Sequence, residues 1–427
     1  MSLELRKIKI TDVKFDDSNK IENGILYLNK KIMEELVTED KRIKSVSFDI
    51  ARPGESVRII PVKDVVEPRA KIDGDTFPGL FKETIEEAGN GITYALSGVA
   101  VTTTGPIVGF QEGLIDMSGP AADYTIFSEI NHVVMTIKKN DNIDAHEHEE
   151  MVRLAGIKLA KYIATIGFEY EDYEAEVYEW ESIGERYNKY PDLPKVAYVY
   201  NCMSQGLLHD TYFYGRDSKL MLPTLISPLE VMDGAIISGN CVSPGSKTTT
   251  YHHENNAVIE SLMSRHGKEI NLVGIILNPL MTTLKEKYRN IMLTVRTVKM
   301  LGVDGVLISQ EGFGNPTTDL MHICKGIENE GIKTVIITNE DAGEDGMSES
   351  LPDSVTEADA IVSTGNSNES FTIPAMDKTI GDLEAIKRIT GGHADSINED
   401  GSLKIEVQII MGSHNLQGNT FLTAYTK

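Results

Sequence analysis

An Asn-Cys pair in a loop of small residues has the clearest chemical potential in this sequence. Asn240 and Cys241 lie within SGNCVSPGSKTTTY, Ser238 to Tyr251. Glycines permit backbone angles that other residues resist and Pro244 fixes its own φ, so the loop could hold one peptide bond in an unusual geometry. The Cys241 thiol could then attack the Asn240 carbonyl to give a thioester. β-Elimination and hydrolysis would cleave the chain and leave a pyruvoyl group. Spacing alone favours a simpler interpretation, an ordinary turn with a semi-buried thiol.

Longer motifs weigh against the simpler interpretation, because they recur along much of the chain, from Asp49 to Leu320. In their order they resemble the proprotein for the α and β subunits of component B of the glycine, sarcosine and betaine reductases. The motifs are DIARPGESVRIIPVKDVVEPR (Asp49 to Arg69), GFQEGLIDMSGPAADYT (Gly109 to Thr125), HEHEEMVRLAG (His146 to Gly156), YPDLPKVAYVY (Tyr190 to Tyr200), SQGLLHDTYFYG (Ser204 to Gly215), EVMDGAIISGNC (Glu230 to Cys241) and SQEGFGNPTTDL (Ser309 to Leu320).

The resemblance implies autocatalytic cleavage between residues 240 and 241, giving an α chain of 1–240 and a β chain of 241–427. A pyruvoyl group derived from Cys241 would form a Schiff base with glycine or sarcosine. Selenocysteine, on the γ subunit of component B or on selenoprotein A, would then displace the amine. Component C would complete the route to acetyl phosphate and ammonia. The chain is thus expected to act in a hetero-oligomer on a small amino acid, without metal or nucleotide.

Three other interpretations remain open. The first is a betaine-specific paralogue, in which a quaternary nitrogen cannot form a Schiff base. The second is an uncleaved, non-catalytic α/β ligand-binding protein. It gains support from one departure: the family carries a second cysteine in a CVSAC-like run, whereas this chain reads Cys241-Val242-Ser243-Pro244-Gly245. A redox role for a second thiol there is therefore excluded. The third is a metal hydrolase built on the histidines near residue 146.

Two histidines and one glycine-rich loop are further candidates for the site. His252 and His253 follow the threonines and could transfer protons near neutral pH, or simply begin a helix. Glu311, Gly312, Gly314 and Asn315 precede another helix, whose free N–H groups could bind a substrate carboxylate. Alternatively, the glycines make a tight turn and Asn315 or Thr317 caps the helix. The GxGxxG and P-loop spacings of nucleotide sites are absent.

The run His146-Glu147-His148-Glu149-Glu150 resembles a metal cluster at first sight. A metalloprotease helix needs two histidines four residues apart, and here they are two apart, on different faces of a helix. A solvated first turn is the better interpretation, because acidic side chains suit the positive end of a helix. We therefore expect no metal ligands in this chain.

Composition predicts a soluble cytoplasmic protein. Lys and Arg number 41 against 65 Asp and Glu, a formal net charge of −24, which argues against binding to nucleic acid or to anionic membranes. The three cysteines, Cys202, Cys241 and Cys324, are too few for a disulfide framework and indicate a reducing compartment.

The elements that must position these residues divide the chain near residue 190. Residues 1–190 are expected to form a β-rich domain with a helix over 145–166 that begins after Asp144. A hairpin is predicted there, with the arms KIKITDVKF (7–15) and ILYLN (25–29) and a turn around Glu22-Asn23-Gly24. Residues 191–427 are expected to form a Rossmann-like α/β domain with a mainly parallel sheet. Its strands are predicted at 195–201, 270–277, 304–309, 333–338 and 359–363, and its helices at 254–266, 282–301 and 317–331.

Overall fold

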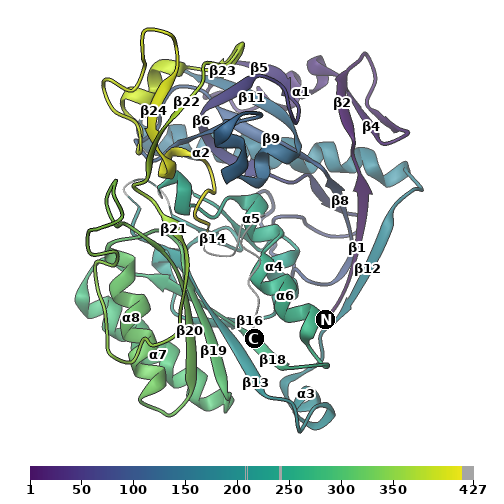
Figure 1. The fold of residues 1–427 in the computed structure, drawn as a ribbon. Coiled ribbons are helices and arrows are strands. Elements are labelled where there is room, and N and C mark those ends of the chain that lie inside the picture. Colours follow the sequence, from purple (N-terminus) through teal and green to yellow (C-terminus); the bar gives the residue numbers. More distant parts are fainter. Residues whose placement is uncertain (207, 209, 240–242, 416–427) are drawn as a thin grey trace.

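The computed structural model describes residues 1–206, 208, 210–239 and 243–415. The chain folds into two β-sheets with one long helix at one end and a mainly parallel sheet with flanking helices at the other (Figure 1). The predicted α/β class is confirmed. None of the helices within these ranges has the length and apolar character needed to cross a membrane.

The first part of the chain builds two larger sheets. A four-stranded sheet has the order β12 (Glu174–Glu179), β1 (Ser2–Lys9), β8 (Gly91–Ser97) and β7 (Arg69–Lys71). Another has the order β10 (Gly113–Asp116), β6 (Val57–Val66), β9 (Val99–Thr104), β11 (Asn131–Lys139) and β5 (Ile43–Ala51). Apolar side chains of α2 (Ala145–Thr165) and α1 (Lys30–Val37) pack against these strands.

The expected helix after Asp144 is confirmed, together with the reason that it begins there. The Asp144 carboxylate accepts from the Glu147 backbone N–H at 2.9 Å, and the Glu147 carboxylate accepts from the Asp144 N–H at 3.0 Å. This reciprocal pair satisfies two backbone donors that the first turn leaves without partners.

The predicted Asn-Gly hairpin exists, but its first strand was wrongly placed. Asn23 and Gly24 have φ values of 51° and 74°, as this kind of turn requires. They join β3 (Lys20–Glu22) to β4 (Ile25–Leu28), whereas β2 (Asp12–Phe15) runs parallel to β4. The stretch before the turn is therefore divided between β1 and β2 and does not form one long arm.

The second part is a sheet buried on both faces. Its order is β16 (Thr224–Ile226), β18 (Asn271–Leu280), β13 (Lys195–Met203), β19 (Gly305–Gln310), β20 (Lys333–Glu340) and β21 (Ile361–Asn366), and only β16 is antiparallel. Alternate residues of β13 enter different cores: Tyr198 and Tyr200 face one side, Ala197 and Val199 the other. All five strands predicted here are confirmed, most within two residues at each end.

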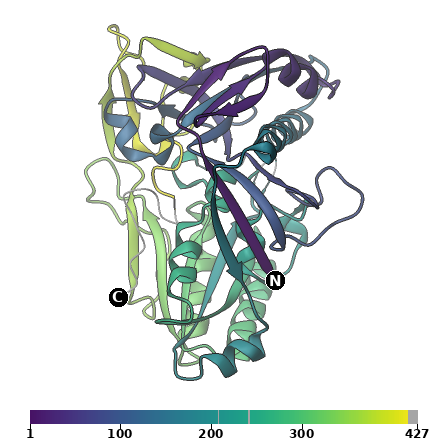
Figure 2. The same cartoon turned by 90° about the vertical axis from the view of Figure 1, so that its right-hand side faces the viewer.

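Helices cover both faces of this sheet (Figures 1 and 2). On one face lie α7 (Leu284–Leu301) and α8 (Asn315–Glu328), and on the other α4 (Pro228–Met232) and α6 (Ala257–Arg265). The helix predicted over 254–266 is in fact two, α5 (Thr250–Glu254) and α6, separated at Asn255-Asn256. The helix α3 (Ile183–Lys189), which carries the capping residues Ser182 and Glu185, was missed.

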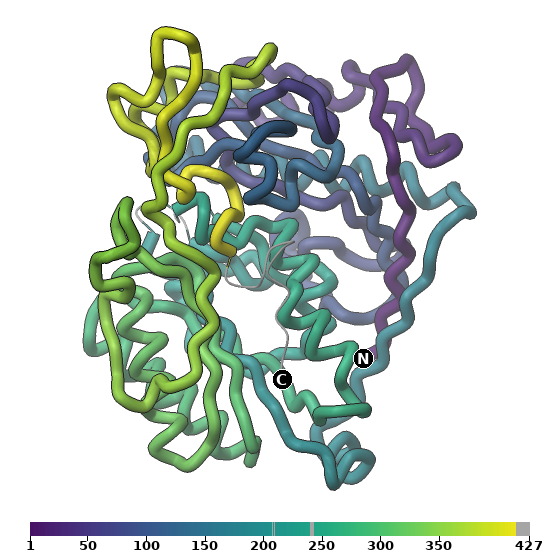
Figure 3. Tube along the Cα trace, viewed as in Figure 1, coloured from purple at the N-terminus to yellow at the C-terminus, as the bar shows by residue number. Residues whose placement is uncertain are grey.

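The end of the described chain returns to the first part. After β21 come β22 (Ser370–Ile373), β23 (Lys378–Gly381) and β24 (Leu403–Glu406), and β23 pairs in parallel with β6. Ile386 and Ile405 share a core with Ile60 and Leu114. Figure 3 shows these yellow segments beside the purple and blue ones. The domain boundary predicted between residues 190 and 191 stays a prediction.

Three short strands, β14 (Tyr212–Phe213), β15 (Arg216–Asp217) and β17 (Ile236–Ile237), form a small sheet before the Asn-Cys pair in the sequence.

Candidate active site

The segments on either side of the Asn-Cys pair lie where the two parts of the molecule meet. Asn240, Cys241 and Val242 themselves are outside the described residues. Before them, Ser238 and Gly239 follow β17, and after them Ser243 leads through the buried stretch Pro244–Thr249 into α5. The helix α5 lies between the upper and lower sheets in Figure 1, and Tyr251 on it packs into the core formed by apolar side chains of β6, β9 and β11.

Gly239 is held by close backbone packing. A Cβ atom built on it would lie 1.8 Å from the Asp210 carbonyl oxygen, much closer than any real contact. Only glycine therefore fits at this position, and the reason is close approach of two backbone segments. The position of the chain directly before the Asn-Cys pair is thus determined by the loop that carries Asp210.

Lys247 fixes the same peptide from the other side. Its side chain is fully buried, and Nζ donates to the carbonyl oxygens of Gly239 at 2.7 Å and Lys63 at 2.6 Å. The Gly239 oxygen also accepts from Ser238 Oγ at 3.0 Å. Hydrogen bonds from a buried ammonium are among the stronger ones in proteins. The carbonyl that precedes the Asn-Cys pair by one residue is therefore both oriented and polarised.

Asp64 forms the second charged group of this cluster. Its carboxylate accepts from Thr250 N at 3.0 Å and Thr250 Oγ1 at 2.7 Å, and Thr250 Oγ1 in turn accepts from Ser238 N at 3.1 Å. Burial raises the pKa of Asp64, while the charge of Lys247 and the Thr250 donors act in the opposite direction. Asp64 thus fixes the start of α5 and the end of the β17 segment with one carboxylate.

The two candidate histidines both lie on α5 and are both buried. Thr249 caps this helix, and its Oγ1 shares a hydrogen bond of 3.0 Å with His252 Nδ1. His253 Nδ1 shares one of 2.6 Å with the Tyr200 hydroxyl. Burial lowers the pKa of His252 to about 3 and that of His253 well below its usual value. Both rings are neutral near pH 7, so a role in proton transfer, which stays a prediction, would begin with acceptance of a proton.

The loop after β19 lies at the point where the strand order reverses. From β13 the chain passes to β18 on one side and then to β19 on the other, and ligands of open parallel sheets bind at the carboxyl ends of such strands. Glu311 is buried there, accepts from Met203 N at 2.9 Å and from the Thr211 hydroxyl, and has its pKa raised by burial. Through Thr211 it holds the loop whose Asp210 carbonyl contacts Gly239.

The remaining residues of that loop make the turn into α8. Gly312 and Gly314 have φ values of 79° and 87°, and Gly314 is the N-cap without a side-chain hydrogen bond. The alternative of capping by Asn315 or Thr317 is therefore wrong, since Pro316 and the glycine form the helix start. The backbone carbonyl of the exposed Asn315 accepts a hydrogen bond from Lys287 Nζ at 3.2 Å. A role of these residues in substrate binding stays a prediction.

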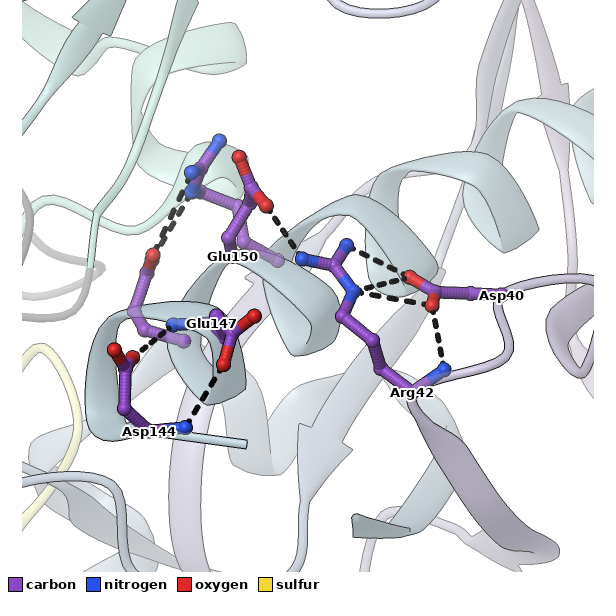
Figure 4. Close-up of polar contacts among 7 residues, drawn as sticks. Asp40, Arg42, Asp144, Glu147 and Glu150 are labelled. Atoms are coloured by element: carbon purple, nitrogen blue, oxygen red, sulfur yellow. Dashed lines mark hydrogen bonds and ion pairs between the residues drawn. The ribbon is translucent and has the colours of Figure 1, made fainter. Parts of the chain in front are cut away.

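The residues of the His146 run form separate contacts along α2. Glu147 is part of the helix cap, and Glu150 accepts from Arg42 at 2.5 Å, while Arg42 also binds Asp40 (Figure 4). Glu149 pairs with Arg153 one turn further along, at 3.0 Å. Within the described ranges no group of three His, Cys, Asp or Glu side chains is arranged to hold a metal ion.

The two described cysteines are packed in the cores. Cys202 lies near the end of β13 in the core that contains Tyr198 and Tyr200, and Cys324 on α8 lies in the core on the opposite face. Burial raises the pKa of both thiols, which keeps them protonated and weakly nucleophilic. Neither described thiol is suited to chain cleavage.

Comparison with known proteins gives one consistent answer. A family model described as glycine/sarcosine/betaine reductase component B subunits matches residues 1–425. The chain is 50% identical to "Glycine reductase complex component B subunits alpha and beta" and 50% identical to "Sarcosine reductase complex component B subunit alpha", both of Peptoclostridium acidaminophilum, with 99% of each chain covered. It is 38% identical to "Betaine reductase complex component B subunit alpha" of the same organism, over 96% of this chain and 95% of that one. No solved structure matches.

Proposed function

The chain belongs to the family of glycine/sarcosine/betaine reductase component B subunits, and we propose that it activates the substrate after cleavage between Asn240 and Cys241. The pyruvoyl group formed from Cys241 would supply a ketone that condenses with the amine of glycine or sarcosine and draws electrons from its C–N bond. A selenocysteine of the γ subunit or of selenoprotein A would displace the amine. Component C would complete the conversion to acetyl phosphate and ammonia.

The main support for this proposal is the hydrogen bond from the buried Lys247 ammonium to the Gly239 carbonyl. A peptide rearrangement needs the reacting atoms held close and aligned, and the preceding peptide is fixed by a buried ammonium and by the Asp210 backbone. An ordinary surface turn needs no buried lysine. Asp64 and the neutral His253, on both of which the charge of Lys247 acts, would serve as the proton acceptors.

The fold also supports cleavage without loss of structure. Residues before position 240 supply β13, whose neighbours on both sides, β18 and β19, come from residues after it. The pairing of β6 with β23 joins the two pieces a second time. The glycine reductase relative is a single sequence of matching length, and its name includes both an α and a β subunit. The two products would therefore stay together as one unit of the hetero-oligomer.

Glycine or sarcosine is the favoured substrate. The chain shares 50% of its residues with the glycine and sarcosine relatives but 38% with the betaine relative. Both favoured substrates have a nitrogen that can condense with a ketone, whereas the quaternary nitrogen of betaine cannot. A betaine-specific paralogue is the alternative, in which the ketone would need another role.

Intact-mass spectrometry of native protein tests the proposal. We expect two chains that end and begin at residues 240 and 241, and a smaller chain that resists Edman degradation unless treated with o-phenylenediamine. Cys241→Ala should give a folded, uncleaved, inactive chain. The matched control Cys324→Ala, at a buried thiol on α8, should still be cleaved. Amino-acid turnover by native protein that is one intact polypeptide with its Cys241 thiol would overturn the proposal and leave an uncleaved ligand-binding protein as the better description.

A further inference from the structure

The helix α7 presents a row of large apolar side chains to solvent. It lies on the outer side of the mainly parallel sheet, beside α8 (Figure 1). Ile291 and Val298 on its inner face pack into the core, whereas Leu284, Tyr288 and Met292 are 61%, 53% and 55% exposed. These three residues are spaced by four, so they are neighbours on successive turns. Exposed apolar groups that are gathered in this way mark a binding surface more often than single ones do.

Basic side chains accompany this row in a chain that is otherwise strongly acidic. The formal net charge is −24, yet α7 has five basic residues and one acidic residue. Lys287 and Lys299 have carboxylate partners in the described structure. The other three are exposed and have no acidic partner among the described residues: Lys285, Arg289 and Arg296. The helical repeat places them along one side of the apolar row, and with that row they form what we call the outer face of α7.

The stability of the helix itself does not account for these charges. Lys285 is the second residue after the N-cap Thr283, where the positive end of the helix dipole disfavours a cation. Arg289 follows one turn later, and like charges four residues apart repel each other. The only acidic residue of α7, Glu286, has its carboxylate at the cap, where it accepts from Thr283 Oγ1 at 2.7 Å. An acidic surface bound from outside would compensate both unfavourable terms.

The outer face of α7 also lies close to the carboxyl edge of the parallel strands. The strand β18 ends at Leu280, which is level with Met203 at the end of β13, and α7 begins four residues later at Leu284. Lys287 Nζ connects this end of α7 to the loop after β19, because it donates to the Asn315 carbonyl at 3.2 Å. A protein bound to the outer face would therefore lie beside the edge at which ligands of open parallel sheets bind.

We propose that the outer face of α7 binds an acidic patch on a protein that associates and dissociates in each catalytic cycle. Unpaired exposed charges speed association by electrostatic steering, and three apolar side chains on one helix make a small contact, which suits a transient complex. The choice of partner rests on the proposed function. There selenoprotein A is the transient partner, because the carbon fragment bonded to its selenium, once the amine has left, has to move on to component C.

The charge of the chain disfavours other occupants of this face. A net charge of −24 repels nucleic acid and anionic membranes as whole partners. A symmetric contact between two copies of this chain would place equal basic residues opposite each other. A protein with an acidic patch meets neither objection.

Charge reversal on α7 tests the proposal with native component B and purified selenoprotein A, whose binding is measured by biolayer interferometry at low and high salt. Lys285→Glu with Arg289→Glu should raise the Kd at least about 10-fold at low salt, mainly by slowing association, and high salt should reduce the difference. The matched control is Arg388→Glu with Lys404→Glu, an equal charge change at exposed residues near the end of the described chain, which should alter the Kd by less than about 2-fold. Wild-type binding by the α7 variant at low salt would refute the proposal.

Two further measurements separate a docking role from a structural one. Met292→Ala should raise the Kd at least about 5-fold, mainly by faster dissociation, whereas Met347→Ala, at a methionine that is 83% exposed outside α7, should leave it unchanged. The urea midpoint of Lys285→Glu with Arg289→Glu should equal or exceed that of wild type, because acidic residues suit the start of a helix. A variant that unfolds more easily would contradict the argument that these charges serve a partner.

The remaining arms identify the occupant and separate this inference from the proposed function. Binding to vesicles of phosphatidylserine and phosphatidylcholine in equal parts, or self-association in sedimentation velocity, would overturn the proposal if the α7 charge reversal abolished it. If native protein gives no o-phenylenediamine adduct, the proposed function fails, but binding of selenoprotein A through α7 would still support the docking surface. An adduct together with selenoprotein A binding that does not depend on α7 would overturn the surface and leave the proposed function standing.

Discussion

Replacing Lys247 by methionine should impair both folding stability and chain cleavage. The substitution removes two hydrogen bonds from a buried ammonium, to Gly239 O at 2.7 Å and Lys63 O at 2.6 Å. Bonds of this kind contribute about 1.5–3 kcal/mol each, so the gross loss is about 3–6 kcal/mol. The lysine no longer has to be desolvated, which offsets part of the loss. We expect the free energy of unfolding to fall by about 2–4 kcal/mol.

Cleavage should slow by at least about 10-fold, because loss of only about 1.4 kcal/mol of orienting energy changes a rate by that factor. The assay is denaturing electrophoresis of freshly folded protein over time, with stability measured by urea unfolding of the uncleaved chain. The matched control is Lys287→Met. Lys287 is 2% exposed and binds Asp319 and the Asn315 carbonyl, far from the Asn-Cys loop in the sequence. That variant should lose stability but cleave normally. Cleavage of Lys247→Met at the wild-type rate would refute the reasoning.

Two further predictions concern the neighbours of the Asn-Cys loop. Gly239→Ala should lower the free energy of unfolding by at least about 1–3 kcal/mol and block cleavage, because the new Cβ would lie 1.8 Å from Asp210 O. Gly184→Ala, inside α3 with open space around it, should instead be neutral or slightly stabilising, and urea titrations of both compare them. Burial raises the pKa of Asp210 from 3.8 to about 7, so its contribution to stability is present below pH 4 and is lost as the pH rises to 7. Unfolding of Asp210→Asn should lack this component, and an unchanged pH profile of the difference from wild type would contradict it.

Much of the parallel sheet could be predicted because its strands carry their own signal. Runs such as Lys195–Met203 are rich in β-branched and aromatic residues, and burial on both faces requires that composition. The division of α5 from α6 could not be foreseen from periodicity. It depends on Asn256, whose side chain caps the second helix by accepting from Ile259 N at 3.0 Å. The first arm of the hairpin was misplaced for a similar reason, because the parallel pairing of β2 with β4 depends on tertiary packing that periodicity does not reveal.

The sequence indicated the two residues that are proposed to react, but not the side chains that hold the neighbouring backbone. Cys241 and Asn240 stand out by type and context, but Lys247 looks like any surface lysine until its neighbours are known. One signal was available: it is the only charged residue between Ser238 and Tyr251, in a stretch of small residues with no other long side chain. Asp64 gave no such signal, because it lies nearly two hundred residues away and meets Thr250 only when β6 packs against α5. The burial of Asp64 beside Thr250 is set by the folded structure and leaves no pattern in the sequence.

The place of the Asn-Cys pair in the topology explains why a chain could be cut there and still work. The cut would fall between β17 and α5, which connect the first strand of the parallel sheet to the helices and strands that flank it. Because β13 is hydrogen-bonded on one side to β18 and on the other to β19, separating the products would break both ladders and expose two apolar cores. The pairing of β6 with β23 would have to open as well. Cleavage would therefore cost little in structure, and the α chain would end one residue after Gly239, whose carbonyl accepts from Lys247.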